Sequence, residues 1–432
     1  MKTDWLLQNA GIIDETGTFF IRKHLLIHQG KVGELLDEIP NDAAEDQTLD
    51  CSGLIITPGL VNLHTHSPMT LFRGLAEDVT IEDWFNREIW PYEKNMNASR
   101  AYAGAMAAIY EMIDYGVTAF ADHYMFPEAI IQAVLDTGIR CDLAPTLFGV
   151  SETFVRDLQQ TAALIQHHQG TNDRLSLRLG PHAPYTCQPV QLKAIIDVAR
   201  VLETGIHIHI SETRQQVADS LHQYEKTPFE ILAEAGGLDV PAILAHGLWI
   251  QPEDRHLLSP DTTLAISPKT YLKLAMGQGH LWDKPQELPL AAGTDGAASS
   301  NTLNPIEQIQ LFGLLGKHFG ENATHFTTRE LWQILMRGHQ ALPFHTGKLQ
   351  PGMQADLVFW DLAHPGVMPV HDPLAAILYS SSKQQVKHVM IGGRWVKQEG
   401  RVCIDAQNIM DQMREKIQEI MAMGKGQAPI RF

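Results

Sequence analysis

The sequence of 432 residues has little cysteine, no long apolar run and a shortage of basic side chains. Its four cysteines, Cys51, Cys141, Cys187 and Cys403, are far apart and form no CxxC pair, which argues against a disulfide framework and predicts reduced, mostly buried thiols. No stretch approaches the roughly 18 uninterrupted apolar residues of a transmembrane helix, and the N-terminus, MKTDWLLQNAG, lacks the apolar segment of a signal peptide. We therefore expect a cytoplasmic protein with no membrane partner.

Acidic residues outnumber basic ones by 50 to 33, and the formal net charge is −17. This balance argues against a nucleic acid or an anionic membrane as partner, because both attract basic side chains. A hydrophobic content of 44% is ample for a large core, and a charged fraction of 19% does not indicate disorder. The oligomeric state stays open, a homo-oligomer included.

Both ends of the chain have the pattern of β-structure. Residues 1–57 contain runs such as DWLLQNAGII and HLLIHQGKVGELL, which alternate apolar with polar residues and break at Gly or Asp. Residues 343–432 contain the strand-like GKLQPGMQADLVFWDL and VKHVMIGGRWVKQEGRV and the helix-like IDAQNIMDQMREKIQEIM. We predict that the two termini together build a small β-sandwich domain, followed by a terminal helix.

The middle of the chain, residues 58–342, alternates short apolar runs with longer amphipathic ones, as in GVTAFADH followed by PEAIIQAVLDTG. This alternation predicts parallel strands joined by crossover helices. The candidate strands are GLVNLHTH, GVTAFADH, IRCDLAPT, LSLRLGPH, IHIHISE, PAILAHG, TTLAISP and PLAAGTDG. Eight strands favour an α/β fold of the (β/α)₈ barrel (TIM-like) type. An open doubly wound sheet is the alternative, but no GxGxxG motif opens any of these units.

Polar residues with metal-binding chemistry fall at the carboxyl ends of these strands. In a strand His64 and His66 point to the same side, because side chains alternate with a period of two. Four further strands carry such a residue at the same end, and the full set is His64, His66, His182, His209, His246 and Asp295. Each one alone is explained as a hydrogen-bonded histidine or a turn cap. Together they favour a metal site, because a barrel brings these strand ends to one face.

Histidine nitrogens with one aspartate oxygen form a ligand set suited to Zn²⁺, with Fe²⁺ and Mn²⁺ as alternatives. We expect one divalent metal per chain, since no lysine ends the fourth strand, where a carbamylated lysine would bridge two metals. A catalytic metal keeps one position for water and lowers the pKa of that water to about neutral, so that hydroxide is present at physiological pH.

Glu212 follows His209 by three residues in IHIHISET and could shuttle a proton between water and a leaving group. A glutamate at a helix N-terminus is an equally good explanation of this residue in isolation. His207 shares a strand face with His209. We assign His209 to the metal because it is nearer the end of the strand, with His207 deeper in the barrel.

Several stretches in order along residues 50–360 resemble the amidohydrolase superfamily: PGLVNLHTHSPMTLFRG, HAPYT, HISET, LAHG, GTDGAASSN and LQPGMQADLVFWD. Within it the sequence is most similar to the 5-methylthioadenosine/S-adenosylhomocysteine deaminases and, more loosely, to the triazine chlorohydrolases. The resemblance implies a metal-dependent barrel enzyme that hydrolyses C–N bonds, other than peptide bonds, in an amidine-type ring.

The resemblance also implies roles for individual catalytic residues. The metal ligands would be His64, His66, His209 and Asp295. Asp295 would act as a base as well, and His246 would orient or polarise the attacking water. Glu212 would be the proton shuttle and would contact the purine ring.

Three residues are implied as further substrate contacts. Glu93 of IWPYEKN would hold the ribose hydroxyls, and His182 of PHAPYT would face the adenine. Arg156 lies roughly where the family has an arginine for the tail of the substrate.

Two sites depart from the family pattern. Leu147 stands in PTLFGV, where the family usually shows an arginine, and SPKTYLKLAMG carries Ser267 and Tyr271 in place of the usual asparagines. We expect both sites to line the substrate side of the pocket. The departures therefore do not affect the expected chemistry, but they leave the identity of the substrate's tail undecided.

The leading hypothesis is a hydrolytic deaminase of an adenine nucleoside (5-methylthioadenosine, S-adenosylhomocysteine or adenosine) that releases ammonia through metal-bound hydroxide. The alternatives are hydrolysis of another amino- or chloro-substituted heterocycle, of guanine, cytosine or triazine type, and ring opening of a cyclic amide. A metabolite-binding barrel without turnover is disfavoured, because it would have no use for a proton shuttle, a water-orienting histidine and an open metal position.

Overall fold

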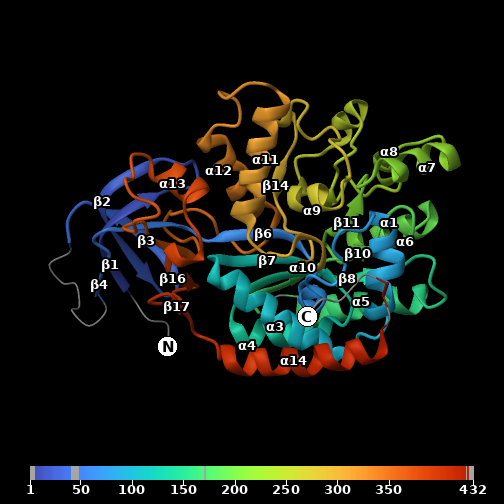
Figure 1. Cartoon of the computed structure of the whole chain (residues 1–432), viewed down its shortest axis with the longest axis horizontal. Coiled ribbons are helices and arrows are strands. Elements are labelled where there is room, and N and C mark those ends of the chain that lie inside the picture. The colour runs from blue at the N-terminus through green and yellow to red at the C-terminus, as the bar shows by residue number, and fades with distance from the viewer. Residues whose placement is uncertain (1–4, 40–47, 170–171, 425, 428–432) are drawn as a thin grey trace.

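A computed structural model gives the structure of the chain at residues 5–39, 48–169, 172–424 and 426–427. Its centre is a ring of parallel strands that alternate with helices (Figure 1). All eight strands expected from the sequence are present, and the fourth is divided in two. In chain order the strands are β6 (Leu60–Thr65), β7 (Val117–Tyr124), β8 (Arg140–Leu147), β9 (Leu175–Leu177) with β10 (Gly180–Pro181), β11 (Ile206–Ile210), β12 (Ala242–His246), β13 (Thr262–Ile266) and β14 (Leu290–Ala292).

The barrel closes through two junctions between its halves. Strands β6 to β10 pair in parallel, as do strands β11 to β14, and a parallel bridge between Leu179 and Ile206 joins the two groups. At the other junction Asn62 of β6, fully buried, accepts a hydrogen bond from the Thr294 backbone and donates one to the Thr294 hydroxyl, at 3.0 and 2.7 Å. The backbone N–H groups of Thr294 and Asp295 donate to the His64 carbonyl. This second junction ties the end of β14 to the end of β6.

Amphipathic helices cover the outside of the barrel. They include α3 (Ala98–Asp114), α4 (Pro127–Thr137), α5 (Phe154–His168), α6 (Pro189–Val201), α7 (Arg214–Tyr224), α8 (Pro228–Glu234), α9 (Pro268–Lys273), α11 (Pro305–Phe319) and α12 (Thr328–Arg337). In α4 the residues Ile130, Ile131 and Val134 are buried at helical spacing, and Gly138 ends the helix with a left-handed φ of 77°. Among the described residues, no helix is long and apolar enough to cross a membrane.

The two ends of the chain build one nine-stranded sheet beside the barrel (Figure 1). Its strands are β1 (Trp5–Ile13), β2 (Phe19–His28), β3 (Lys31–Leu36), β4 (Thr48–Asp50), β5 (Leu54–Pro58), β15 (Leu357–Asp361), β16 (Val386–Ile391), β17 (Arg394–Gln398) and β18 (Arg401–Val402). The antiparallel pair β5–β15 joins the N-terminal strands to the C-terminal ones. Leu7, Ile27, Phe359 and Met390 contribute to a core that is separate from the barrel core.

A buried ion pair connects the sheet to the barrel. Arg140, at the start of β8, donates from Nε and Nη2 to the two carboxylate oxygens of Asp356, at 2.8 and 3.0 Å, and neither side chain is exposed. The Gly392 N–H donates to the same carboxylate at 2.8 Å. Because two hydrogen bonds join the two charges, the ion pair is stable although it is buried away from water.

Replacing Asp356 with Ala would leave the charge of Arg140 buried without its partner. We expect the free energy of unfolding to fall by about 3–5 kcal/mol, measured by urea denaturation. The control is Lys193→Ala, which removes an exposed ion pair with Asp197 within α6 and should cost less than about 1 kcal/mol. Equal losses for the two variants would show that the buried pair does not hold the sheet and barrel together.

Candidate active site

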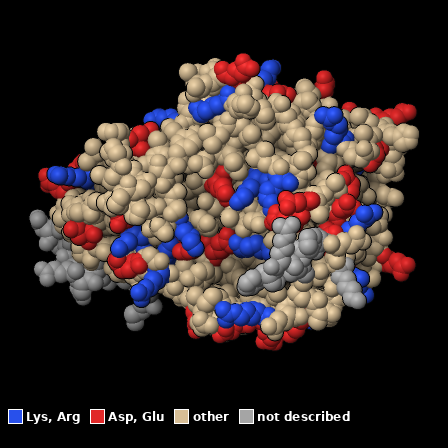
Figure 2. All heavy atoms as spheres, in the orientation of Figure 1, with Lys and Arg blue, Asp and Glu red and all other residues tan. Residues whose placement is uncertain are grey.

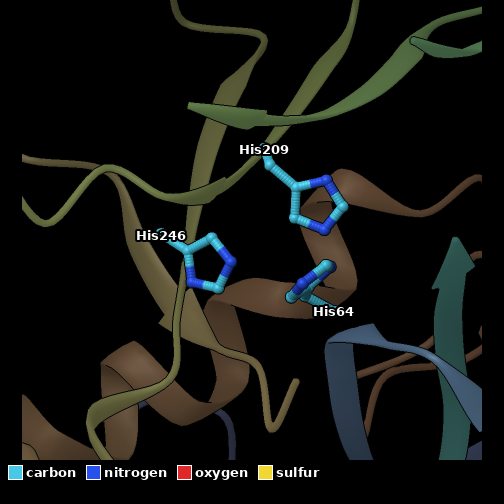
Figure 3. A group of neighbouring side chains, drawn as sticks. All are labelled: His64, His209 and His246. Atoms are coloured by element: carbon cyan, nitrogen blue, oxygen red, sulfur yellow. The ribbon is translucent and has the colours of Figure 1, made fainter. Parts of the chain in front are cut away.

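The carboxyl ends of the barrel strands meet at one mouth, where active sites of this architecture lie. His64 and His66 come from β6, His209 from β11 and His246 from β12, while Asp295 follows β14. The rings of His64, His209 and His246 point toward one another, and each offers a ring nitrogen within 4.8 Å of the others (Figure 3). The structure therefore brings the four residues that the family resemblance implies as ligands to one mouth, in overlapping groups of three that also include His246 and His123.

The distances within this cluster fit a single metal ion. The Nε2 atoms of His66 and His209 are 3.2 Å apart, and Asp295 Oδ1 lies 3.4 Å from His66 Nε2 and 3.8 Å from His64 Nε2. Tetrahedral ligands with bonds of about 2.0–2.1 Å are separated by about 3.3–3.4 Å. His64 Nε2 is buried and has no hydrogen-bond partner among the described residues. A bond to a metal ion would satisfy this nitrogen. These residues could hold a metal ion.

Hydrogen bonds on the far side of each ring select the ligand nitrogen. His66 Nδ1 donates to the His123 carbonyl at 2.5 Å, and His209 Nδ1 donates to the His182 carbonyl at 2.8 Å. With the proton on Nδ1, the lone pair is on Nε2 and faces the cluster. Burial lowers the pKa of His209 well below its usual range, with a smaller effect of the neighbouring histidines, so the ring is neutral at physiological pH.

His207 lies one layer deeper, as expected from its place in β11. Its Nε2 is 2.9 Å from His64 Nδ1, so the two rings share one proton between them. Burial lowers the pKa of both rings well below the usual value, and both are therefore neutral. His207 thus orients His64 and does not itself face the cluster.

Glu212 and His246 form a second polar pair at the same mouth. Glu212 Oε1 lies 3.6 Å from His246 Nε2. The N-cap of α7 is Thr213, which shares a capping box with Gln216, so the Glu212 carboxylate is not used as the helix cap. The alternative explanation of Glu212 as a helix-terminus residue therefore does not account for its side chain, which lines the cavity above the histidines.

Backbone strain accompanies these side chains. Ser211, His246 and Asp295 have φ values of 45°, 72° and 60°, in the left-handed region that residues with a Cβ seldom adopt. Each stands where a strand ends and the chain turns away from the barrel. Strain of this kind is concentrated at functional sites.

A cavity of about 470 Å³ opens above the cluster. One wall is the segment between β6 and α3, which includes α1 (Ile81–Asp83), the π-helical turn η3 (Trp84–Ile89) and α2 (Trp90–Glu93). Glu93 lines the cavity from this segment and is only 8% exposed. Burial raises its pKa, and an interaction with Tyr124 opposes the shift.

His182 also lines the cavity, and its Nδ1 is 2.9 Å from the Thr186 hydroxyl. Burial, with a smaller contribution from His66, lowers its pKa to about 3, so the ring is neutral. The structure does not bring Arg156 to the cavity. Its side chain is mostly exposed on α5 and pairs with the adjacent Asp157 at 3.2 Å, because the first turn of the helix directs both residues outward.

The two departures from the family pattern do not line the cavity, contrary to expectation. Leu147 is buried in the barrel wall, and Thr146 and Phe148, on either side of it, face the cavity instead, because side chains alternate along β8. Tyr271 accepts a hydrogen bond from the Ser267 N–H at 2.9 Å and lies behind His246.

Sequence reasoning missed His123 and the aromatic side chains of the cavity wall. His123 is the last residue but one of β7, so GVTAFADH carried the same signal as the other strand ends. Its Nδ1 is 3.0 Å from the Thr146 hydroxyl, and its ring packs against His209. Trp84, Phe85 and Trp90 line the cavity from a segment whose path no sequence pattern predicts.

The fold and the cluster together define a hydrolase of the (β/α)₈-barrel class, with side chains at the strand ends that could hold a metal ion. The chain belongs to the amidohydrolase family, whose model matches residues 55–396. It is 33% identical over 424 residues to a 5-methylthioadenosine/S-adenosylhomocysteine deaminase of Desulforudis audaxviator, covering 94% of this chain and 96% of that one.

Two further proteins support this relationship. A 5'-deoxyadenosine deaminase of Methanothermobacter thermautotrophicus is 32% identical over 404 residues, covering 92% of this chain and 94% of that one. A crystal structure of an adenosine deaminase from Xanthomonas campestris with bound zinc superposes with a TM-score of 0.91 at 26% identity, covering 97% of this chain and 99% of that one.

Replacing His209 with Ala should remove most of the bound metal, because the ring supplies one of the converging nitrogens. Elemental analysis of the purified protein should give about one divalent ion per native chain and much less for the variant. Glu212→Gln is the control and should keep its metal. Equal metal loss in both variants would place Glu212 among the ligands and contradict the assignment.

Proposed function

We propose that this protein is a hydrolytic deaminase of adenine nucleosides that carry a small uncharged group at the 5' position, such as 5-methylthioadenosine and 5'-deoxyadenosine. The observation that carries the proposal is the position of Glu212, beside the histidine cluster and in the same cavity as the buried carboxylate of Glu93. The names of the relatives, a 5-methylthioadenosine/S-adenosylhomocysteine deaminase and a 5'-deoxyadenosine deaminase, support deamination of an adenine nucleoside.

We further propose that one Zn²⁺ ion is held by His64, His66, His209 and Asp295. Three imidazole nitrogens and one carboxylate oxygen suit this ion, and the related adenosine deaminase contains bound zinc. When bound, a divalent ion supplies the Lewis-acid activation that makes a water molecule nucleophilic at neutral pH.

The remaining steps fall to side chains at the mouth. Asp295 accepts a proton as the water oxygen bonds to the amino-bearing ring carbon, and His246 orients that water. Glu212 donates its proton to the adjacent ring nitrogen and regains one from the hydroxyl group formed on the ring carbon, while the amino group takes the proton held by Asp295 and leaves as ammonia. The ring carbon keeps the oxygen as a carbonyl.

Glu93 is the residue suited to recognise the ribose. A carboxylate can accept hydrogen bonds from two neighbouring hydroxyls at once, and such charge-assisted bonds are strong where water is excluded. A substrate without the hydroxyls would not form these bonds with Glu93 and is therefore disfavoured.

The charge of the cavity argues against an amino-acid tail on the substrate. Every lining residue with a formal charge is acidic, and the set is Glu82, Glu93, Glu212, Asp219 and Asp295. No lysine or arginine is among the residues that line the cavity, all of which belong to the described part of the chain. The carboxylate of S-adenosylhomocysteine would therefore have no cationic partner there, whereas Trp84, Phe85 and Phe148 offer apolar surface for a methylthio group.

Glu212→Gln should leave the metal content unaltered and lower turnover by about 10²-fold or more, the usual effect of losing a general acid–base residue. Ammonia release from 5-methylthioadenosine, measured beside elemental analysis of the same preparation, tests this. Native turnover in the Glu212→Gln variant would show that Glu212 does not transfer a proton in the reaction.

Ammonia release from a panel of substrates tests the function itself. We expect kcat/KM for 5-methylthioadenosine and 5'-deoxyadenosine to exceed that for adenine by about 10²-fold and that for S-adenosylhomocysteine by about 10-fold or more. Glu93→Ala should raise KM for the nucleosides and leave the activity on adenine almost unaltered. If adenine were a better substrate than 5-methylthioadenosine, the assignment to nucleosides would be wrong. If S-adenosylhomocysteine were the better substrate, only the argument from the charge of the cavity would be wrong.

A further inference from the structure

The segment that carries Glu93 has little structure of its own. Residues 81–93 form a three-residue helix, a six-residue π-helical turn and the four-residue α2. Elements this short do not hold their shape in isolation, because each hydrogen bond must offset the ordering of several residues. The position of Glu93 therefore depends on contacts with the rest of the chain.

The C-terminal helix supplies part of that support. Helix α14 (Ala406–Met423) lies along the outside of the barrel beside α3 (Figure 1). Ile420 is 1% exposed, and Arg100 of α3 pairs with Glu419 at 3.0 Å. Arg100 also donates to the carbonyl of Asn95 at 2.5 Å, two residues beyond Glu93. The end of α14 is thereby anchored next to α2.

Gly424, Gly426 and Gln427, which follow α14, contact the 81–93 segment directly. The Gly426 N–H donates to the Tyr92 hydroxyl at 2.9 Å, and the Gln427 N–H donates to the Glu88 carboxylate at 2.7 Å. Gly424 packs so closely on the Tyr92 ring that any side chain at position 424 would overlap it. Tyr92 and Glu88 are only 3% and 4% exposed.

Tyr92 and Glu93 are neighbours in α2 but lie on different faces of it. Tyr92 contacts the C-terminal residues, whereas Glu93 lines the cavity and interacts with Tyr124. A shift or rotation of α2 that broke the contacts of Tyr92 would also move the Glu93 carboxylate. The outer contact and the cavity wall are thus mechanically coupled through one helical turn.

We propose that the residues following α14 position Glu93 for ribose binding, with Tyr92 and Glu88 as the positioning residues. The inference rests on the proposed function in one respect, namely that Glu93 binds the ribose. By this proposal Gly424, Gly426 and Gln427, which are far in sequence from the barrel motifs, contribute to the affinity for nucleosides.

The kinetic test compares Glu88→Ala, Tyr92→Phe and a chain ending at Met423 with the native enzyme. For each we expect KM for 5-methylthioadenosine to rise roughly 10-fold, the equivalent of one charge-assisted hydrogen bond, with kcat altered less than about twofold and activity on adenine unaltered. Glu88→Gln keeps an oxygen acceptor for the Gln427 N–H and should restore the native KM. Glu415→Ala removes an exposed carboxylate of α14 and is the matched control.

A double substitution separates positioning from general stability. In the Glu93→Ala background, Glu88→Ala should cause no further rise in KM for the nucleoside. A rise of equal size with and without Glu93, or native KM values in all three variants, would overturn the inference.

Hydrogen exchange tests the same coupling without turnover. Residues 84–93 should exchange faster in the substrate-free chain ending at Met423 and in Glu88→Ala than in the native enzyme, while β11 and β12 stay protected. Faster exchange without any nucleoside activity would refute the proposed function and keep the coupling. Unaltered exchange would refute the coupling and leave the proposed function standing.

Discussion

The chemistry of this protein depends on one geometric constraint: the carboxyl ends of all the parallel strands must meet at one mouth of the barrel. Residues that are 231 positions apart in the chain, His64 and Asp295, become neighbours for this reason, with 3.8 Å between Nε2 and Oδ1. The ring closes where β14 returns to β6, and there the Thr294 and Asp295 backbones donate to the His64 carbonyl. The bonds that close the barrel also position His64 and Asp295, two of the side chains that could hold a metal ion.

This arrangement is costly for the folded state. His64, His207 and His209 are buried and neutral, and the left-handed φ values of Ser211, His246 and Asp295 each cost of the order of 1–3 kcal/mol. Such strain persists only where surrounding contacts over-determine the conformation. The buried amide of Asn62 and the bidentate Arg140–Asp356 pair belong to the rigid framework that holds these conformations in place.

Acidic and basic side chains are interspersed on the surface shown in Figure 2, so the distribution of charge on that face does not mark the site.

Chemistry and selectivity are divided between different parts of the chain. The strand ends carry the histidines and the aspartate that could hold a metal ion, and Glu212 lies beside them. The cavity wall above them comes from the 81–93 segment and from the loops, whose length and path vary freely without disturbing the barrel. Gly426 and Gln427, far along the chain from the barrel motifs, contact that segment.

The sequence by itself determined the eight strands and showed residues of metal-binding type at the ends of several of them, because the alternation of apolar runs and the residue that follows each run are local properties of the chain. It also indicated Glu93, through a resemblance in the residues around it. Only the tertiary structure decided which neighbours face the cavity. His123 shared the strand-end signal yet was overlooked, whereas Arg156 was assigned to the substrate and lies outside on α5. Which side chains converge depends on the path of loops in space, and no local pattern encodes a distance across the barrel mouth.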